Sequence, residues 1–380
     1  MKRKTILLSI VGALLTLLLL FAIVLNVGKP GPRAQAPAIS TEIMDKYEMR
    51  MTNRVSDALE GVLSIEKVYW LKDQDLVAPE PDQSKFGEAA TAAELQWLLE
   101  DAADLLDGQE TYFSTEAQLH WGSNVKYYLD ETIFAVAWKE YHGSVYTFAE
   151  IKIAHPSQFR RFLAGGEFGS VTQFYTTEMA ADVNAVVASS GDFYKFRNYG
   201  TIVYDGTVQR INSVHIDTCM IDDQGDLHLI PKNTIIEMEE AQKYVDEHNI
   251  RFSVAFGPIL VDNFERCEPN YYMIGEINDE YPRAALCQMG PLHYLLVTAN
   301  DMSSTKQEND DELKGIAGTP TIHQFARVIQ ATGCEKAYAL DGGQTAAIAM
   351  NDQLVNRVLY GYQRRISDII YFATAVPDGG

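Results

Sequence analysis

The sequence predicts an α+β protein in which mixed β-sheet dominates, preceded by a helical region and one transmembrane helix. Three observations lead to this class. From about residue 126 onward, short apolar runs of strand length follow one another, separated by turn dipeptides. Before them, residues 41–63 and 91–108 repeat apolar side chains with a period of about 3.6 residues. At the start of the chain, residues 6–25 are apolar with only small interruptions.

The composition limits the classes of partner. The 380 residues are 47% apolar, which suffices for one large or two ordinary domains with buried cores. The net charge is −21, and the basic residues are scattered singly or in pairs. A protein that binds nucleic acid needs a basic footprint, so the sequence argues against that class of partner. The acidity itself is typical of a well-solvated surface.

The apolar segment 6–25 predicts a membrane anchor. Its twenty residues would span about 30 Å as a helix, the thickness of the hydrocarbon core. Lys2, Arg3 and Lys4 precede it, and such a cationic flank stays in the cytoplasm. We therefore expect a single-pass protein of the cell membrane whose C-terminal part is extracellular.

A cleaved signal peptide is the alternative to an anchor. The tripeptide Ala34-Gln35-Ala36 resembles a cleavage site, but it lies well past the apolar run, and Pro37 would follow the cut. We favour the uncleaved anchor. Residues 1–27 then form the cytoplasmic tip and transmembrane helix, and the proline-containing residues 28–40 form a linker.

Residues 41–125 are predicted to form a helical extracellular region. The first amphipathic stripe covers 41–63. The second begins at a capping box formed by Thr91 and Glu94, and it ends at Gly108. Helices of this length gain most of their stability from packing, so we expect them to pack on the domain that follows.

Residues 126–380 are predicted to form the main domain. Asp205-Gly206, Gln224-Gly225 and Gly290-Pro291 mark its turns. Helices are expected at 156–164 and 237–247, and from Thr319, with Pro320 at the first position, to Ala331. Strands are expected at 145–153, 184–189, 200–211, 226–230, 252–261, 284–289, 293–299, 337–340 and 366–376.

The four cysteines leave two alternatives open. Outside a membrane they can form two disulfides in three connectivities, or they can be small buried hydrophobic residues with free thiols. Their spacing matches no zinc signature. We favour the second alternative for all four, which are Cys219, Cys267, Cys287 and Cys334.

The sequence lacks a P-loop, a dinucleotide fingerprint, a serine-hydrolase elbow and an HExxH motif. Instead, polar residues stand beside glycines at the ends of several predicted strands. Loops of this kind let a backbone approach a ligand closely and often carry function. They are Ser190-Gly191-Asp192 with Tyr194, Arg197 and Asn198 after it, Phe256-Gly257-Pro258, Pro282-Arg283 and Asp341-Gly342-Gly343.

The last of these lies in the stretch YALDGGQT, residues 338–345, which reads as strand, tight turn and strand. A hairpin turn requires one glycine beside an Asp or Asn, but here two glycines follow the acid. The second glycine therefore points to a purpose other than turning the chain.

Five motifs, in order along residues 151–375, resemble the phosphodiester glycosidase family. They are a strand, N/S-G-D-F-Y and hairpin at 185–208, F-G-P-x-L-V at 256–261, P-R-T-A-I-G around Pro282 and Arg283, a helix followed by N-L-D-G-G-G at 321–344, and R-x-I-S-D at 364–368. The first 150 residues lie outside the resemblance.

The resemblance implies hydrolysis of a sugar-1-phosphodiester and a carbohydrate or glycosyl-phosphate as substrate. Asp341 would lie at the pocket floor, and Asp192 would be a second carboxylate, as base for water or as ligand of a metal. Arg197 and Arg283 would hold phosphate oxygens. The resemblance implies no particular cofactor, and a divalent metal is left open. The remaining expected substrate contacts are Gly342, Gly343, Gln344, Tyr194, Asn198, Ser190 and Gly257.

The sequence departs from the family pattern at several of these motifs. Ala339, Gln344, Ser190 and Ala284 replace the family's usual Asn, third Gly, Asn and Thr, and residues 297–301 lack an expected Asp and Arg. Two hypotheses follow. The protein is either an anchored extracellular hydrolase of envelope or secreted polysaccharide, or a non-catalytic glycan-binding or polysaccharide-assembly protein on the same fold.

Three histidines are further candidates. His215 with Asp217 is a weak catalytic or metal-binding pair in a predicted strand. His293 is expected in the core or at a sheet edge. His323, in the first turn of a predicted helix, is expected on the surface, although it could point toward the same pocket.

Overall fold

The computed structural model describes residues 78–114, 125–192, 194–195, 198–268, 279–300 and 318–376. The expected anchor at 6–25, the linker at 28–40 and the helix at 41–63 lie outside the described residues. No helix in the described part of the chain is long and apolar enough to cross a membrane. The anchor therefore remains a prediction.

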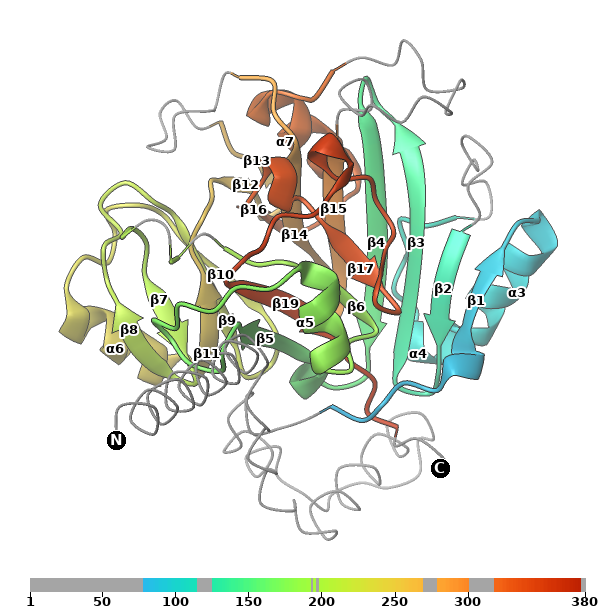
Figure 1. Ribbon diagram of the computed structural model, residues 1–380, viewed down its shortest axis with the longest axis horizontal. Helices are drawn as coiled ribbons and strands as arrows, with labels where there is room; N and C mark the ends of the chain where they lie inside the picture. Colours follow the sequence, from blue (N-terminus) through green and yellow to red (C-terminus); the bar gives the residue numbers. More distant parts are fainter. Residues whose placement is uncertain are drawn as a thin grey trace, which may run out of the picture. The chain divides into compact units, whose positions relative to one another are not determined.

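A nine-stranded antiparallel sheet forms the centre of the fold (Figure 1). Every residue of its strand β4 is buried, because the sheet is covered on both faces. Strands of this kind appear in a sequence as continuous apolar runs. In sheet order the strands are β1 (Phe86–Ala89), β2 (Val125–Leu129), β3 (Ile133–Tyr141), β4 (Val145–Ile153), β15 (His293–Asn300), β14 (Arg283–Gly290), β16 (Lys336–Leu340), β12 (Ile259–Asp262) and β13 (Glu265–Arg266).

A five-stranded antiparallel sheet packs against one face of the first sheet. The core between the two sheets contains Ile151 and Leu296 from the larger sheet and Ile348 and Ile370 from the smaller one, all fully buried. In sheet order its strands are β18 (Gln353–Leu354), β17 (Ile348–Met350), β6 (Val187–Ser190), β19 (Asp368–Phe372) and β5 (Phe159–Leu163).

Two smaller sheets form a lobe beside β5 (Figure 1). One is the hairpin of β7 (Ile202–Tyr204) and β8 (Thr207–Arg210), and the other is the sheet of β10 (Leu227–Ile230), β9 (Thr218–Asp222) and β11 (Ile250–Val254). Helix α6 (Met238–Glu247) packs on them through Ala241 and Val245.

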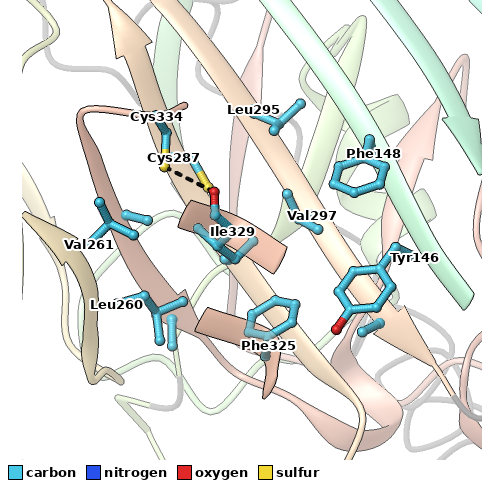
Figure 2. Packing of buried hydrophobic residues seen from close by; sticks show 14 of the residues in the cluster. Tyr146, Phe148, Leu260, Val261, Cys287, Leu295, Val297, Phe325, Ile329 and Cys334 are labelled. Carbon is cyan, nitrogen blue, oxygen red and sulfur yellow. Dashed lines mark hydrogen bonds between the residues drawn. The ribbon is translucent and has the colours of Figure 1, made fainter. Parts of the chain in front are cut away.

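Helices cover the outer faces. Helices α3 (Ala92–Asp101), α4 (Ala103–Leu106) and α7 (Ile322–Ala331) pack on the free face of the large sheet. Figure 2 shows Phe325 and Ile329 of α7 against Val297 of β15 and Leu260 of β12. Helix α5 (Thr176–Asp182) covers the five-stranded sheet through Met179 and Ala180.

Several predicted elements are confirmed. Strand β4 has the expected bounds, the Asp205-Gly206 turn joins β7 to β8, and α6 matches the helix expected at 237–247 within one residue. The capping box of Thr91 and Glu94 opens α3, and α3 and α4 pack in the core of the main domain as expected. Strands β1, β2, β3 and β9 were not predicted.

The helix predicted at 156–164 is wrong. Only a 3₁₀ turn forms at Pro156–Gln158, and the chain continues as strand β5. The stretch contains two arginines. In the structure Arg160 and Arg161 are both buried, and Arg161 is paired with carboxylates more than thirty residues away in the sequence.

The start predicted for the last helix is also wrong. The helix begins at Ile322, because the Thr321 hydroxyl accepts from the Gln324 amide while the Gln324 side chain accepts from the Thr321 amide. This capping box places Pro320 before the helix and not at its first position. The end at Ala331 is confirmed.

All four cysteines have free thiols. Cys219, Cys287 and Cys334 are buried and Cys267 is partly buried, as expected for small hydrophobic residues. Cys287 and Cys334 lie side by side under α7, where the Cys334 thiol donates to the Ile329 carbonyl oxygen at 3.6 Å (Figure 2).

Candidate functional site

The stretch YALDGGQT connects the two main sheets. Strand β16 belongs to the nine-stranded sheet and ends at Leu340, whereas β17 belongs to the five-stranded sheet and begins at Ile348. The predicted sequence of strand, turn and strand is present, but the two strands do not pair with each other as a hairpin would. The chain instead crosses between the sheets, and the Asp341 amide donates to the Gly191 carbonyl oxygen at 3.4 Å, at the end of β6.

The crossing explains the two glycines. A Cβ atom on Gly342 would lie 2.5 Å from the Pro282 carbonyl oxygen, so only glycine fits there. Gly343 has a φ of +66°, and its amide donates to the same oxygen at 2.8 Å. This left-handed conformation favours glycine. The pair thus brings the end of β16 against the start of β14.

A cavity of about 200 Å³ opens where these strand ends meet. Asp341 and Arg283 lie in it together, with backbone from both strands and one residue of α7. A turn near the C-terminus forms the remaining wall. The lining residues are Phe256, Gly257, Tyr281, Arg283, Ala284, Ile322, Ala339, Leu340, Asp341, Gly342, Gln344, Leu359, Tyr360 and Arg364.

The Asp341 carboxyl group has an unusual proton affinity. Burial raises its pKa from the ordinary 3.8 to about 7, and the neighbouring Asp192 raises it as well. A hydrogen bond with Thr345 and the charge of Arg364 act in the opposite direction. A carboxyl group that titrates near neutral pH in a cavity is suited to proton transfer or to stabilising developing positive charge.

Two guanidinium groups accompany this carboxyl group. Arg283 at the start of β14 is 9% exposed, and its Nη2 donates to the Asp279 carbonyl oxygen at 2.8 Å. Its guanidinium also lies 5.9 Å from the ring centre of Tyr281. Arg364 is exposed to solvent and close enough to Asp341 to lower its pKa. The cavity therefore combines one acid with two permanent positive charges, a pattern that suits an anionic substrate.

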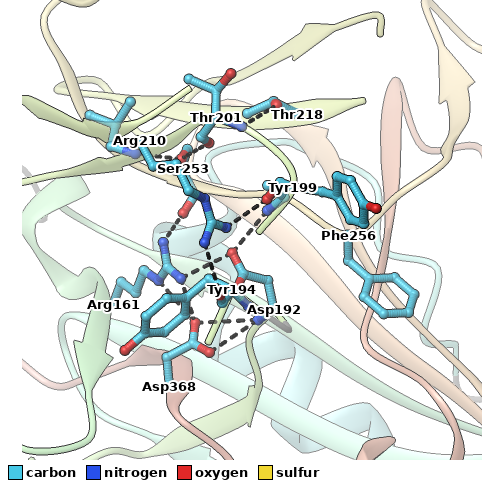
Figure 3. Close-up of polar contacts among 12 residues, drawn as sticks. Arg161, Asp192, Tyr194, Tyr199, Thr201, Arg210, Thr218, Ser253, Phe256 and Asp368 are labelled. Carbon is cyan, nitrogen blue, oxygen red and sulfur yellow. Dashed lines mark hydrogen bonds and ion pairs between the residues drawn. The ribbon is translucent and has the colours of Figure 1, made fainter. Parts of the chain in front are cut away.

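The second predicted acid, Asp192, lies in a sealed cluster (Figure 3). Arg161 of β5 donates from Nη2 to Asp192 Oδ2 at 3.0 Å and from Nε to Asp368 Oδ2 at 2.9 Å. Asp192 also accepts from the amides of Ala255 at 2.9 Å and Tyr194 at 2.6 Å. Both carboxylates and the guanidinium have fully buried side chains.

This cluster connects β5, β6 and β19. The Asp192 amide donates to both carboxylate oxygens of Asp368 at 3.3 Å. A Cβ atom on Gly191 would lie 2.1 Å from Asp368 Oδ2, so the glycine makes the close approach possible. Burial raises the pKa of Asp368 to about 7, while Arg161 lowers it and Asp192 raises it further.

Residues 183–373 match the sequence model of the phosphodiester glycosidase family. The match covers just over half of the 380-residue chain and contains both the cavity and Asp192. The chain belongs to the phosphodiester glycosidase family. Strands β2 to β5 precede the match and complete the same two sheets, so the folded domain is larger than the matched part.

Solved structures similar to this family member include three proteins. A hypothetical protein from Synechocystis has 14% identity and a TM-score of 0.44 over 66% of this chain, which spans 63% of that protein. The second is the catalytic domain of zebrafish N-acetylglucosamine-1-phosphodiester alpha-N-acetylglucosaminidase, auto-inhibited by its pro-peptide. It has 16% identity and a TM-score of 0.48 over 71% of this chain, which spans 92% of that protein. A putative exported protein from Burkholderia pseudomallei has 12% identity and a TM-score of 0.39 over 61% of this chain, which spans 74% of that protein. No curated protein matches.

The structure brings some of the predicted site residues together. Asp341, Arg283, Gly342, Gln344 and Gly257 line the one cavity, and Gly343 holds its floor against Pro282. This cavity is therefore the candidate functional site of the described residues.

Other predicted residues lie elsewhere. Tyr194 is 2% exposed and stacks on Phe168 with ring centres 5.3 Å apart, Ser190 is buried at the end of β6, and Asn198 is exposed. None of the three lines the cavity, and neither does Asp192. Arg197 lies outside the described residues.

Sequence reasoning missed the wall formed by Tyr281, Tyr360 and Arg364. Arg364 is the first residue of the R-x-I-S-D motif, and Tyr281 precedes the Pro-Arg motif. Both positions were quoted for the resemblance, so the motifs themselves were the signal. Nothing in the sequence around Tyr360 indicated the cavity.

The histidines lie away from this site. His215 is exposed in a turn and not in a strand, and both oxygens of Asp217 accept backbone amides, from Lys232 at 2.8 Å and Ile259 at 3.0 Å. His293 is buried and bonded to Glu150 at 2.8 Å, as expected for a core residue.

His323 lies on the first turn of α7, where its Nδ1 is 3.6 Å from Glu268. Its neighbour Ile322 lines the cavity instead. In the described part of the chain, no three His, Cys, Asp or Glu side chains form a group that could hold a metal.

Proposed function

We propose that the protein hydrolyses a glycosyl phosphodiester. Water adds to the anomeric carbon, the bond from that carbon to the phosphate oxygen breaks, and the products are a free sugar and a phosphomonoester. The observation that supports this most is the cavity in which Asp341 lies with Arg283 and Arg364. Family membership supports the same class of reaction.

The charges of the cavity suit the two halves of such a substrate. Glycosyl cleavage develops positive charge at the sugar carbon, which an ionised Asp341 would stabilise. The phosphate is anionic throughout, and planar guanidinium groups hold phosphate oxygens well. A phosphate monoester is also a good leaving group, so the reaction needs less help from a general acid than hydrolysis of an ordinary glycoside.

Asp192 has a different role in this proposal. Its oxygens accept two backbone amides and the Arg161 guanidinium, and its side chain is sealed from the cavity. We assign Asp192 two roles. It holds Gly191 in place, whose carbonyl oxygen accepts a hydrogen bond from the Asp341 amide, and it helps to raise the pKa of Asp341. Asp192 is thus a positioning residue, and Asp341 is the proposed catalytic carboxylate.

The proposed location is the outer side of the cell membrane. Its support is the apolar segment 6–25 behind three basic residues. Protease added to intact cells should digest the main domain but leave a cytosolic marker intact. Protection of the domain in cells whose surface proteins are digested would overturn the location without affecting the proposed chemistry.

A panel of glycosyl phosphodiesters tests the reaction. The zebrafish relative is named for N-acetylglucosamine-1-phosphodiester, so methyl phosphodiesters of N-acetylglucosamine, glucose and galactose are the first probes. Release of sugar by the wild type and not by Asp341→Asn is the expected result. Binding without release would favour the non-catalytic glycan-binding alternative. Release at equal rates by both proteins would overturn the assignment of Asp341.

A further inference from the structure

Two exposed tyrosines stand at the mouth of the cavity. Tyr360 is 59% exposed and lines the cavity, and Tyr362 is 65% exposed two residues later. Their ring centres lie 6.4 Å apart with 31° between the planes. Large exposed aromatic side chains beside a polar cavity are uncommon unless they bind something.

The backbone at this place is held in an unfavourable conformation. Tyr360 has a φ of +64° and a ψ of 3°, which bulky residues rarely adopt. Such a conformation costs free energy and persists where the surroundings impose it, often at ligand sites. It is the conformation in which Tyr360 forms part of the cavity wall.

The surroundings that impose it belong to the site. The Gln344 side-chain amide donates to the Tyr362 carbonyl oxygen at 3.0 Å, and the Gly361 amide donates to the Val358 carbonyl oxygen at 2.9 Å. Val358 is buried. The two rings are therefore presented by an anchored turn, which lowers the entropic cost of binding a ligand there.

The cavity is too small to contain an extended substrate. Pockets that enclose a drug-sized ligand measure roughly 300–1,000 Å³. At about 200 Å³ this cavity holds little more than one sugar or phosphate group, so the rest of the substrate lies outside, beside the tyrosines.

We propose that Tyr360 and Tyr362 bind a second sugar ring by stacking, so that the preferred substrate is a glycan chain and not a free glycosyl phosphodiester. A pyranose ring presents an apolar face of C–H groups, which an aromatic face attracts, while its hydroxyl groups stay in water. For a sugar ring to fit between the two tyrosine rings, their planes would have to be parallel and about 7 Å apart, which is twice the contact distance of carbon atoms. The sugar therefore lies across the two tyrosines and not between them.

This inference rests on the proposed function for the reaction, but its binding test does not. Saturation-transfer NMR on the wild type should show contacts with tetrasaccharides of N-acetylglucosamine, glucose or galactose, and weaker ones with the corresponding monosaccharides. Tyr362→Ala should remove the difference and Tyr362→Phe should keep it, because stacking needs the ring and not the hydroxyl.

Phe264→Ala is the matched control. Phe264 is 55% exposed and also has a positive φ, of 65°, but it lies in the turn between β12 and β13. We expect it to bind tetrasaccharides as the wild type does. Thermal melting of all variants shows that the chain remains folded.

Kinetics provide the second readout. In Tyr362→Ala, the ratio of kcat/KM for an oligosaccharide-bearing phosphodiester to that for the monosaccharide phosphodiester should fall about tenfold, the size of one lost stacking contact. An unchanged ratio together with unchanged binding would overturn the inference. Tyrosine-dependent binding of uridine monophosphate in place of any tetrasaccharide would also overturn it. Tyrosine-dependent glycan binding without hydrolysis would overturn only the proposed reaction.

Discussion

Asp341 and Asp192 look alike in the sequence and differ in the structure. Each stands at the end of a predicted strand beside a glycine. Asp341 lines a cavity, whereas the Asp192 side chain is fully buried against Arg161 and two backbone amides. The partners that separate them are contributed by β5 and β11, far away in the chain.

The difference shows how one local pattern serves two purposes. At Gly191 and at Gly342 the glycine lets two chain segments approach more closely than a Cβ atom would allow. In the first case the approach seals a carboxylate in a network of hydrogen bonds, which stabilises the fold. In the second it leaves the carboxyl group facing a cavity, with its pKa raised to about 7, which suits chemistry.

Arg161→Met should produce the largest effect on stability. It would leave Asp192 and Asp368 buried without their shared cation, and such losses cost about 3–5 kcal/mol. Urea denaturation measures the change. Lys243→Met, at an exposed pair on α6, is the control and should change stability by less than about 0.5 kcal/mol. A stable Arg161→Met protein would show that the cluster does not hold the sheets together.

Asp341→Asn should produce the opposite pattern. Turnover should fall about 100-fold or more, equivalent to roughly 3 kcal/mol of transition-state stabilisation, because the charge is lost while the size is kept. Initial rates on a phosphodiester that the wild type cleaves measure this. Should Asp341→Asn retain turnover on that substrate, Asp341 is not the catalytic carboxylate.

The stability of Asp341→Asn tests the same contrast. The pKa of Asp341 is higher in the folded state, about 7, than its ordinary 3.8. The folded protein therefore holds this proton better, and the associated stability is lost as pH rises from about 4 through 7. Asp341→Asn should match the wild type near pH 4 and melt at a higher temperature than the wild type at pH 8. A lower melting temperature at pH 8 would contradict a buried, costly charge.

Much of the fold was predictable because its strands are buried on both faces. The apolar run at 294–297 in β15 stands out in the sequence. Strand β5 did not, because it contains two arginines that are buried in the structure, and Arg161 is paired with carboxylates from other parts of the chain. A single sequence shows that a residue is charged, but not that tertiary partners will bury it.

The site was predictable where a motif carries the chemistry and not where the fold carries it. Asp341, Arg283 and the two glycines came from motifs, and they meet at the cavity. Tyr360 has no motif, and its place depends on a strained turn that only the structure shows. The strand-turn-strand pattern around Asp341 likewise did not reveal that its two strands belong to different sheets, since strand pairing is decided by the sheets and not by the turn.

Alanine at the two glycines of the cavity should have intermediate effects. In Gly342→Ala the added methyl group would clash with the backbone carbonyl oxygen of Pro282, so the strand ends must separate. We expect the free energy of unfolding to fall by about 2 kcal/mol and activity to be lost. In Gly343→Ala the added methyl group would contact the Tyr281 side chain first, and not a backbone atom. The free energy of unfolding should therefore fall by about 1 kcal/mol, the cost of a positive φ for a residue other than glycine. Denaturant melts with parallel activity assays measure both.

Gly333→Ala isolates the cost of the backbone conformation. Gly333 has a φ of +79° at the end of α7, and no atom lies within 4 Å of a Cβ placed there. If Gly342→Ala is no worse than Gly333→Ala, the close approach to Pro282 is not needed for the cavity.

The smallest expected effect is a shift in the pH dependence of activity in Arg364→Gln. If ionised Asp341 carries the reaction, kcat/KM for the wild type should rise with pH and level off above about 7. Arg364 lowers the pKa of Asp341, so its removal should move this rise to higher pH. Arg365→Gln is the matched control, because Arg365 is the exposed neighbour and does not line the cavity. A rate that falls through pH 7 would mean that Asp341 acts as a general acid. A rise that does not move in Arg364→Gln would mean that a group other than Asp341 sets it.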